Sequence, residues 1–242
     1  MSDLCNRRPK CNNEKYEGHE KCILHCDKSD FVNNDILLFW QKIRQLHNTR
    51  AEIIIEDVNF PKFGVLKHHS DTHFHSYSEI YYHHSYSFVH NLKFTKCIFT
   101  DDVDLNYFTS KNILTFDSCT FYGDIKFKLI NNLELINCEF KNEFLLENTN
   151  CNNLDIKNTK FNKDVNISVN EKLNINDNSI FRNNVQIKGK STLKTRIEDS
   201  EYDKRLTIQD NDYIVMKNVK LKSNIQFNSK NNDINLENIT FP

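Results

Sequence analysis

Apolar residues recur from residue 92 to residue 241 in a pattern that repeats about every 20 residues. A small or medium-sized residue stands two positions before the centre of each repeat, and pairs of apolar residues with the spacing apolar-x-apolar stand before the centre and, except in the last repeat, after it. The centres are Phe99, Phe121, Phe140, Phe161, Phe181, Tyr202, Leu221 and Phe241. Because the apolar-x-apolar spacing has the two-residue period of a β-strand, each repeat predicts three short strands that send their apolar side chains to one face.

Two repeats depart from this spacing. The apolar pair Leu173 and Ile175 comes one residue early relative to its centre, and the repeat of Tyr202 has the looser pair Leu193 and Ile197. One repeat alone cannot bury its apolar face, whereas stacked repeats bury a continuous core. The pattern therefore predicts an all-β solenoid with about 20 residues per coil; a β-sandwich with evenly spaced strands is the alternative.

The repeat units resemble those of the pentapeptide-repeat proteins. The resemblance lies in segments such as Cys119-x-Phe121-x-x-x-Ile125-x-Phe127, and it covers about 150 residues well. It implies a right-handed β-helix, although steps of five and six residues between the strands depart from the strict pattern of that family. Members of the family have many roles, so the resemblance indicates the fold more than the function.

A first coil is predicted at the residues that precede the regular repeats, because Ile53, Ile55, Val58 and Phe60 have the same spacing. Phe60 and Phe99 are 39 residues apart, which predicts one further coil between them. Its centre is Ile80 or Tyr82, and Tyr82 gives the better apolar set. We therefore expect the solenoid to cover residues 51–242, with irregular coils at 51–91 and regular coils at 92–242.

Residues 1–28 hold a cluster of possible metal ligands: Cys5, Cys11, His19, Cys22, His25 and Cys26. Zinc prefers four tetrahedral thiolate or imidazole ligands, and such a site can fold a segment that has no core of its own. We predict one structural zinc ion in a knuckle-like segment, bound by Cys5, Cys11, Cys22 and His25, with Cys26 as the alternative to His25. Free thiols or disulfides are the other interpretations of this cluster.

An amphipathic helix is predicted over residues 29–50, since Ile36, Phe39, Trp40, Ile43 and Leu46 recur at intervals of three and four. A solenoid end exposes apolar side chains and unpaired strand groups. We therefore expect this helix to cap the first coil, with Trp40 over the core. Binding to a partner or to a membrane surface is the alternative role.

Seven of the ten histidines lie between residues 68 and 90. His73-x-His75 would place two imidazoles on one face of a strand, which is enough to begin a metal site. A polar loop is the simpler interpretation of this stretch.

Charge and composition exclude several classes of protein. The formal net charge is −1, and residues 92–242 hold 21 Lys or Arg against 21 Asp or Glu, which argues against a nucleic-acid-binding surface and against the acidic face of a DNA mimic. No apolar run is long enough to span a membrane, and the N-terminus has no signal-peptide pattern, so we expect a cytoplasmic protein.

These observations favour a non-catalytic scaffold that binds another protein. The alternatives are a DNA-mimicking topoisomerase ligand and a metal-dependent enzyme that uses the His-rich stretch. The sequence stops at Phe241 and Pro242, halfway through a repeat. We therefore also expect either a homodimer through this coil or a missing segment of a longer protein.

Overall fold

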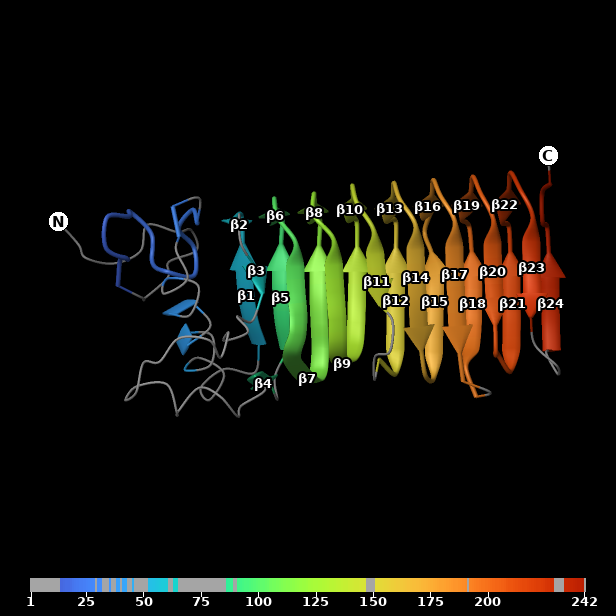
Figure 1. The fold of residues 1–242 in the computed structure, drawn as a ribbon, viewed down its shortest axis with the longest axis horizontal. Helices are drawn as coiled ribbons and strands as arrows, with labels where there is room; N and C mark the ends of the chain where they lie inside the picture. Colours follow the sequence, from blue (N-terminus) through green and yellow to red (C-terminus); the bar gives the residue numbers. More distant parts are fainter. Residues whose placement is uncertain are drawn as a thin grey trace, which may run out of the picture.

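The computed structural model describes residues 14–28, 30–31, 35, 38–39, 41–42, 45, 52–60, 63–64, 86–88, 91–146, 151–190, 192–228 and 233–241. From residue 52 onwards the described chain winds into a column of stacked coils (Figure 1). Neighbouring strands of the column run parallel, and equivalent strands are about 20 residues apart. The predicted all-β solenoid is therefore confirmed.

Each regular coil contributes three strands, which build three walls of the column. The first wall contains β1 (Glu52–Glu56), β5 (Asn91–Thr95), β12 (Asn153–Lys157), β15 (Lys172–Asn176), β18 (Lys194–Glu198), β21 (Tyr213–Lys217) and β24 (Asp233–Glu237). The second wall contains the two-residue strands β2 (Asn59–Phe60), β6 (Ile98–Phe99), β8 (Thr120–Phe121), β10 (Glu139–Phe140), β13 (Lys160–Phe161), β16 (Ile180–Phe181), β19 (Glu201–Tyr202) and β22 (Lys220–Leu221). The third wall contains β3 (Phe63–Gly64), β11 (Phe144–Leu146), β14 (Val165–Val169), β17 (Val185–Gly189), β20 (Leu206–Gln209) and β23 (Ile225–Asn228).

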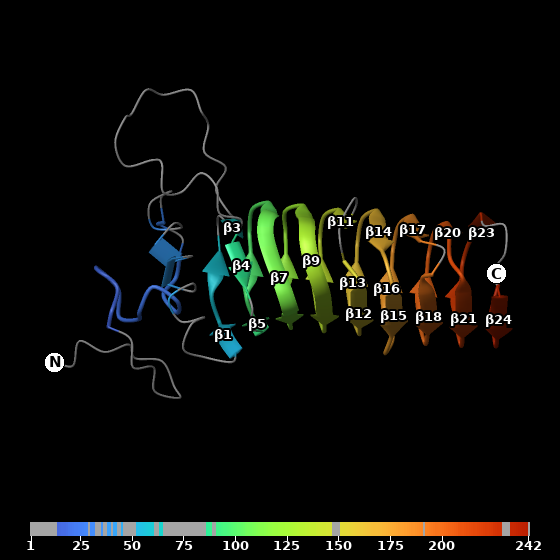
Figure 2. The same cartoon turned by 90° about the horizontal axis from the view of Figure 1, so that it is seen from below.

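Two long strands join the first and third walls. β7 (Val103–Asp117) and β9 (Ile125–Ile136) each leave the third wall of one coil and enter the first wall of the next, so both walls form one 16-stranded sheet. The second wall is a separate sheet of eight strands. β4 (Tyr86–Phe88) pairs with the middle of β7. Figure 2 shows the first and third walls on two sides of the column.

The core of the column is organised around a stack of aromatic rings. Consecutive centroids lie 4.5–5.1 Å apart, and the ring planes are within 7° of parallel. The rings belong to the predicted repeat centres, in the order Phe60, Phe99, Phe121, Phe140, Phe161, Phe181 and Tyr202. All of them are buried, so the aromatic position of each repeat points inward as the spacing predicts.

Every corner between the first and second walls contains a left-handed residue, three positions before the repeat centre. Asparagine and aspartate tolerate this conformation better than most side chains. These residues, with φ between 45° and 63°, are Asp57, Lys96, Ser118, Asn137, Asn158, Asn178, Asp199, Asn218 and Asn238. Their side chains also connect adjacent coils, since Asn158 Nδ2 donates to Asn137 Oδ1 at 2.8 Å and Asn238 Nδ2 donates to Asn218 Oδ1 at 3.1 Å.

The same corner absorbs the extra residue of the early repeat. Leu173 and Ile175 stay opposite their counterparts in β12, and Phe181 stays opposite Phe161. The additional position is taken up by Asp177 and Asn178, which are both left-handed. Strand register is thus preserved by a change in the corner alone.

The predicted coil between Phe60 and Phe99 is wrong. β1 pairs directly with β5, so that Ile53 lies opposite Leu92, and the rings of Phe60 and Phe99 stack at 5.1 Å. No coil fits between strands that pair with each other. Ile80 and Tyr82 lie outside the described residues, and the segment that contains them connects two adjacent coils.

The looser repeat also needs a correction. Thr195, and not Leu193, lies opposite Leu173 and takes the inward position, while Leu193 is buried just before β18. The Thr195 hydroxyl donates to Asn211 Oδ1 at 2.5 Å, which satisfies the buried polar group. An inward threonine interrupts the apolar pattern, which is why the spacing alone misplaces this strand.

The segment predicted as a capping helix is described only in part. Asp35, Leu38, Phe39, Gln41, Lys42 and Gln45 have helical geometry. Phe39 is fully buried, and its ring lies 5.5 Å from that of Phe60 in the first coil. Trp40 lies outside the described residues, so its predicted place over the core stays a prediction.

Phe140→Ala should lower the free energy of unfolding by about 3–5 kcal/mol, because it leaves a gap in the ring stack. Tyr122→Ala is the matched control: Tyr122 is a 53% exposed aromatic residue that directly follows β8, and its loss should cost less than about 0.5 kcal/mol. Urea denaturation measures both values. Equal losses in the two variants would contradict the aromatic column.

Asn158→Val should destabilise the protein by about 1–2 kcal/mol more than Asn158→Gly, because a β-branched residue is strained in the left-handed conformation. Both variants lose the amide contact with Asn137, so their difference isolates the backbone effect. Thermal denaturation of the pair measures it. If valine and glycine were equivalent, this corner would not be left-handed.

Candidate functional site

A tight turn brings together two of the predicted zinc ligands. The backbone N–H groups of His25 and Cys26 both donate to the carbonyl oxygen of Cys22 at 2.9 Å. This turn places Cys22 Sγ 3.2 Å from His25 Nδ1, and both side chains are buried. The Cys-x-x-His spacing therefore produces a close thiol–imidazole pair.

The separation of this pair suits two ligands of one zinc ion. Zinc–sulfur bonds of about 2.3 Å and zinc–nitrogen bonds of about 2.0–2.1 Å in a tetrahedron place the two ligand atoms roughly 3.5 Å apart. Cys5 and Cys11 lie outside the described residues. Within the described ranges, no group of three His, Cys, Asp or Glu side chains is placed to hold a metal ion.

The Cys26 thiol contacts groups other than the Cys22–His25 pair. Its Sγ lies 3.8 Å from the carbonyl oxygen of Ile23 and 4.0 Å from Lys28 Nζ. Burial raises the pKa of this thiol above its ordinary value. Of the two alternatives for the last ligand, His25 is therefore the one that contacts Cys22.

Lys28 is a functional candidate that the sequence pattern does not reveal. Its side chain is completely buried, and its ammonium group donates to the carbonyl oxygen of Cys26 at 3.0 Å. Burial lowers the pKa of Lys28 to about 8, an effect that the nearby cysteines partly oppose. A lysine within a charged segment predicts solvent exposure, and only tertiary contacts could have shown otherwise.

Aromatic contacts hold this N-terminal segment together. The rings of Tyr16 and Phe31 have centroids 5.4 Å apart, and Tyr16 Oη donates to Asp35 Oδ1 at 2.5 Å. The hydrogen bond to Asp35, followed by burial, raises the pKa of Tyr16 to about 12. Residues on both sides of Lys28 are thus fixed to each other.

The cysteines of the repeats are core residues. Cys97, Cys119 and Cys138 are buried as predicted, and each thiol donates to a backbone carbonyl oxygen of the preceding coil at 3.3–3.7 Å. Burial raises the pKa of the Cys119 thiol, and it raises that of Cys151 to about 12. These thiols therefore lack the features of reactive cysteines.

The histidines of the His-rich stretch are not among the described residues. They are His68, His69, His73, His75, His83, His84 and His90. The hypothesis of a second metal site at these positions stays a prediction.

The second wall interleaves acidic and basic side chains. Glu139 pairs with Lys141 at 2.6 Å and with Lys160 at 3.2 Å, and Asp203 pairs with Arg182 at 2.7 Å. The hydrogen bond from Lys141 is the largest cause that lowers the pKa of Glu139 to about 2. The pKa of Asp203 also falls to about 2, because Arg182 and Lys222 outweigh the effect of its burial.

The third wall is almost free of charge over its last four strands. Two outward rows run across β14, β17, β20 and β23, and paired backbone positions keep each row in register. One row is Asn166, Gln186, Thr207 and Gln226, and the other is Ser168, Lys188, Gln209 and Asn228. Lys188 is the one charged residue in these two rows.

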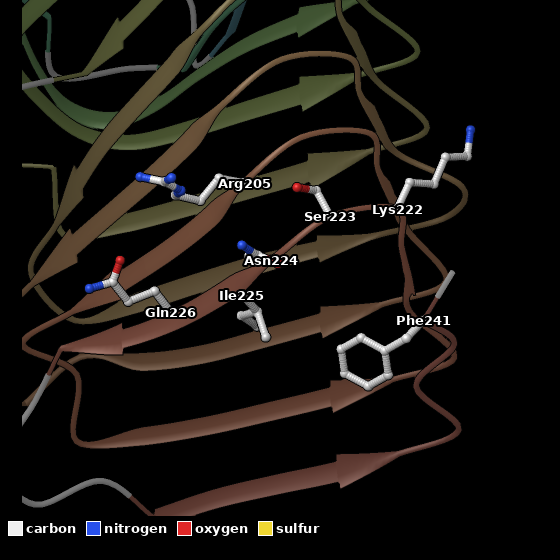
Figure 3. A pocket seen from close by; sticks show the side chains of 7 residues that line it. All are labelled: Arg205, Lys222, Ser223, Asn224, Ile225, Gln226 and Phe241. Atoms are coloured by element: carbon white, nitrogen blue, oxygen red, sulfur yellow. The ribbon is translucent and has the colours of Figure 1, made fainter.

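A shallow cavity of about 780 Å³ lies at the last coil (Figure 3). It is lined by Arg205, Lys222, Ser223, Asn224, Ile225, Gln226 and Phe241. Figure 3 shows the charged ends of Arg205 and Lys222 pointing in different directions, so they do not converge on one ligand position. None of these lining residues carries a carboxylate, thiol or imidazole group.

The last described coil exposes core-type side chains. Leu236 is 49% exposed and Phe241 is 56% exposed, although both occupy inward positions of the repeat. The expectation that a second copy or a further segment covers this coil stays a prediction.

Among the described residues, no helix has the length and apolar character needed to cross a membrane. No protein-family model, curated protein or solved structure matches the chain significantly, so the fold and the site rest on the geometry above.

Proposed function

We propose that this chain is a non-catalytic, cytoplasmic scaffold of the pentapeptide-repeat type that binds another protein through the outer surface of its solenoid. The observation that carries the proposal is the nearly uncharged outer surface of β14, β17, β20 and β23. Cores of protein–protein interfaces are poor in charged residues, because charges are costly to remove from water. Rows of amide and hydroxyl side chains can instead replace their hydrogen bonds to water with hydrogen bonds to a partner protein.

Two alternatives have less support. A DNA mimic needs a continuous acidic face, whereas Lys172 lies directly opposite Lys194 on the first wall and the acids of the second wall are paired with bases. A metal-dependent enzyme would need the His-rich stretch, whose histidines lie outside the described residues. The charge distribution therefore favours the scaffold over the DNA mimic.

The proposed zinc site has a structural role. Cys22 and His25 supply one half of the tetrahedron, and we infer that Cys5 and Cys11 supply the other half. Four protein ligands leave no open position for a catalytic water molecule. The contact between Phe39 and Phe60 supports the idea that the segment after this site caps the first coil.

Elemental analysis of the untagged protein should find one zinc ion per chain. The ion should be lost from the double variant Cys5→Ser with Cys22→Ser, because both are proposed ligands. Cys138→Ser is the matched control, since serine already occupies the equivalent inward position at Ser179 and Ser200. Protein without zinc would refute the proposed site. A second metal ion per chain that is lost when His73 and His75 are replaced would instead favour the metal-dependent enzyme.

A photo-crosslinking amino acid at Gln186 should capture one discrete protein in the source cells, because Gln186 lies near the middle of the uncharged surface. The same amino acid at Lys194, on the first wall, should not capture it. A second variant, which combines the photo-crosslinking amino acid at position 186 with Thr207→Asp, should no longer form the crosslinked product. Mass spectrometry identifies the adduct; identical products from both positions, or adducts with nucleic acid, would contradict the proposed face.

A further inference from the structure

The ammonium group of Lys28 lies at the end of the aromatic column. Its Nζ is 5.1 Å from the ring centroid of Phe60, which is the first ring of the stack. Phe39 contacts the same ring from the N-terminal segment. Lys28 therefore closes the column at the end where the stack begins.

Three aromatic rings surround this ammonium. Its Nζ lies 5.1 Å from the ring centroid of Phe31 and 5.0 Å from that of Phe39, in addition to its contact with Phe60. Each distance is within the roughly 6 Å over which a cation is attracted to a ring face. Because the rings come from separate segments, one side chain joins the N-terminal segment to the first coil.

A buried ammonium is costly unless its partners are held in place. No carboxylate of the described residues forms a salt bridge with Lys28; its ammonium group donates to the carbonyl oxygen of Cys26 at 3.0 Å and, more weakly, to Cys26 Sγ at 4.0 Å. That carbonyl directly follows the turn in which His25 and Cys26 donate to Cys22. Whatever fixes the turn therefore also fixes the acceptor of Lys28.

We propose that Lys28 is a latch that seals the first coil, and that zinc bound at Cys22 and His25 holds this latch closed. The inference rests on the proposed zinc site. Zinc fixes the turn, and a site of three thiolates and one neutral imidazole carries a net charge of −1, which attracts the ammonium. Without zinc the turn relaxes, the ammonium returns to water, and the first coil opens at Phe60.

Amine acylation of the full-length protein, followed by mass spectrometry, tests the latch. With zinc bound, Lys28 should be acylated at least tenfold more slowly than Lys160, whose side chain is 44% exposed. Removal of zinc by a chelator should abolish this protection at Lys28 and leave Lys160 unchanged. Protection of Lys28 that persists after zinc removal would overturn the latch and leave the zinc site standing.

A second measurement does not depend on acylation. Lys28→Met keeps an unbranched side chain only one atom shorter but removes its charge, and it should weaken zinc binding about tenfold or more in competition with a chromophoric chelator, as outer-shell substitutions do. Lys28→Arg should recover most of the affinity. Unchanged affinity in Lys28→Met would overturn the coupling. If wild-type protein bound no zinc at all, the proposed zinc site would fail first, and elemental analysis reports that outcome separately.

Discussion

A coil of this protein can bury its apolar face only against another coil. The aromatic column shows this dependence most directly, because each ring from Phe60 to Phe181 is covered by the ring of the next coil, and Tyr202 ends the stack. Stacked pairs of this kind contribute about 0.5–1.5 kcal/mol each beyond their buried area. This dependence has two consequences. Strand register must be kept from coil to coil, and each end of the column needs something other than a coil to cover its apolar face.

Register within the walls is kept because the irregularities lie between the walls, either at the corners or where β7 passes from the third wall to the first and its register against β9 shifts. The extra residue near Asp177 and Asn178 changes a corner and leaves both flanking strands in place. The segment between β3 and β4 is a larger case of the same principle, since the strands on either side pair as if it were absent. At the corners between the first and second walls a left-handed position accommodates such changes, and the frequent asparagines and aspartates there reduce its cost.

The sequence allowed the inward positions to be predicted because they repeat at a fixed spacing. The prediction of a coil between Phe60 and Phe99 was wrong, because 39 residues is about the length of two coils and the alternating aromatic residues there resemble a strand. The pairing of β1 with β5 rules this coil out. Such a pairing between distant segments cannot be read from the local sequence. The left-handed corners could have been found from the recurrence of Asn and Asp three residues before each centre. Lys28 could not, because its burial depends on three rings from distant positions.

The N-terminal end of the column must cover the first aromatic ring without another coil. At this end a charged group covers the first ring, although an apolar side chain would avoid the cost of burying an ammonium. A buried charge is more sensitive than an apolar plug to small displacements of its partners, because its stability depends on the Cys26 carbonyl and on three ring faces at once. This sensitivity is the property on which the proposed latch depends: zinc at Cys22 and His25 would hold the Cys26 carbonyl in place, and loss of the zinc would release the ammonium.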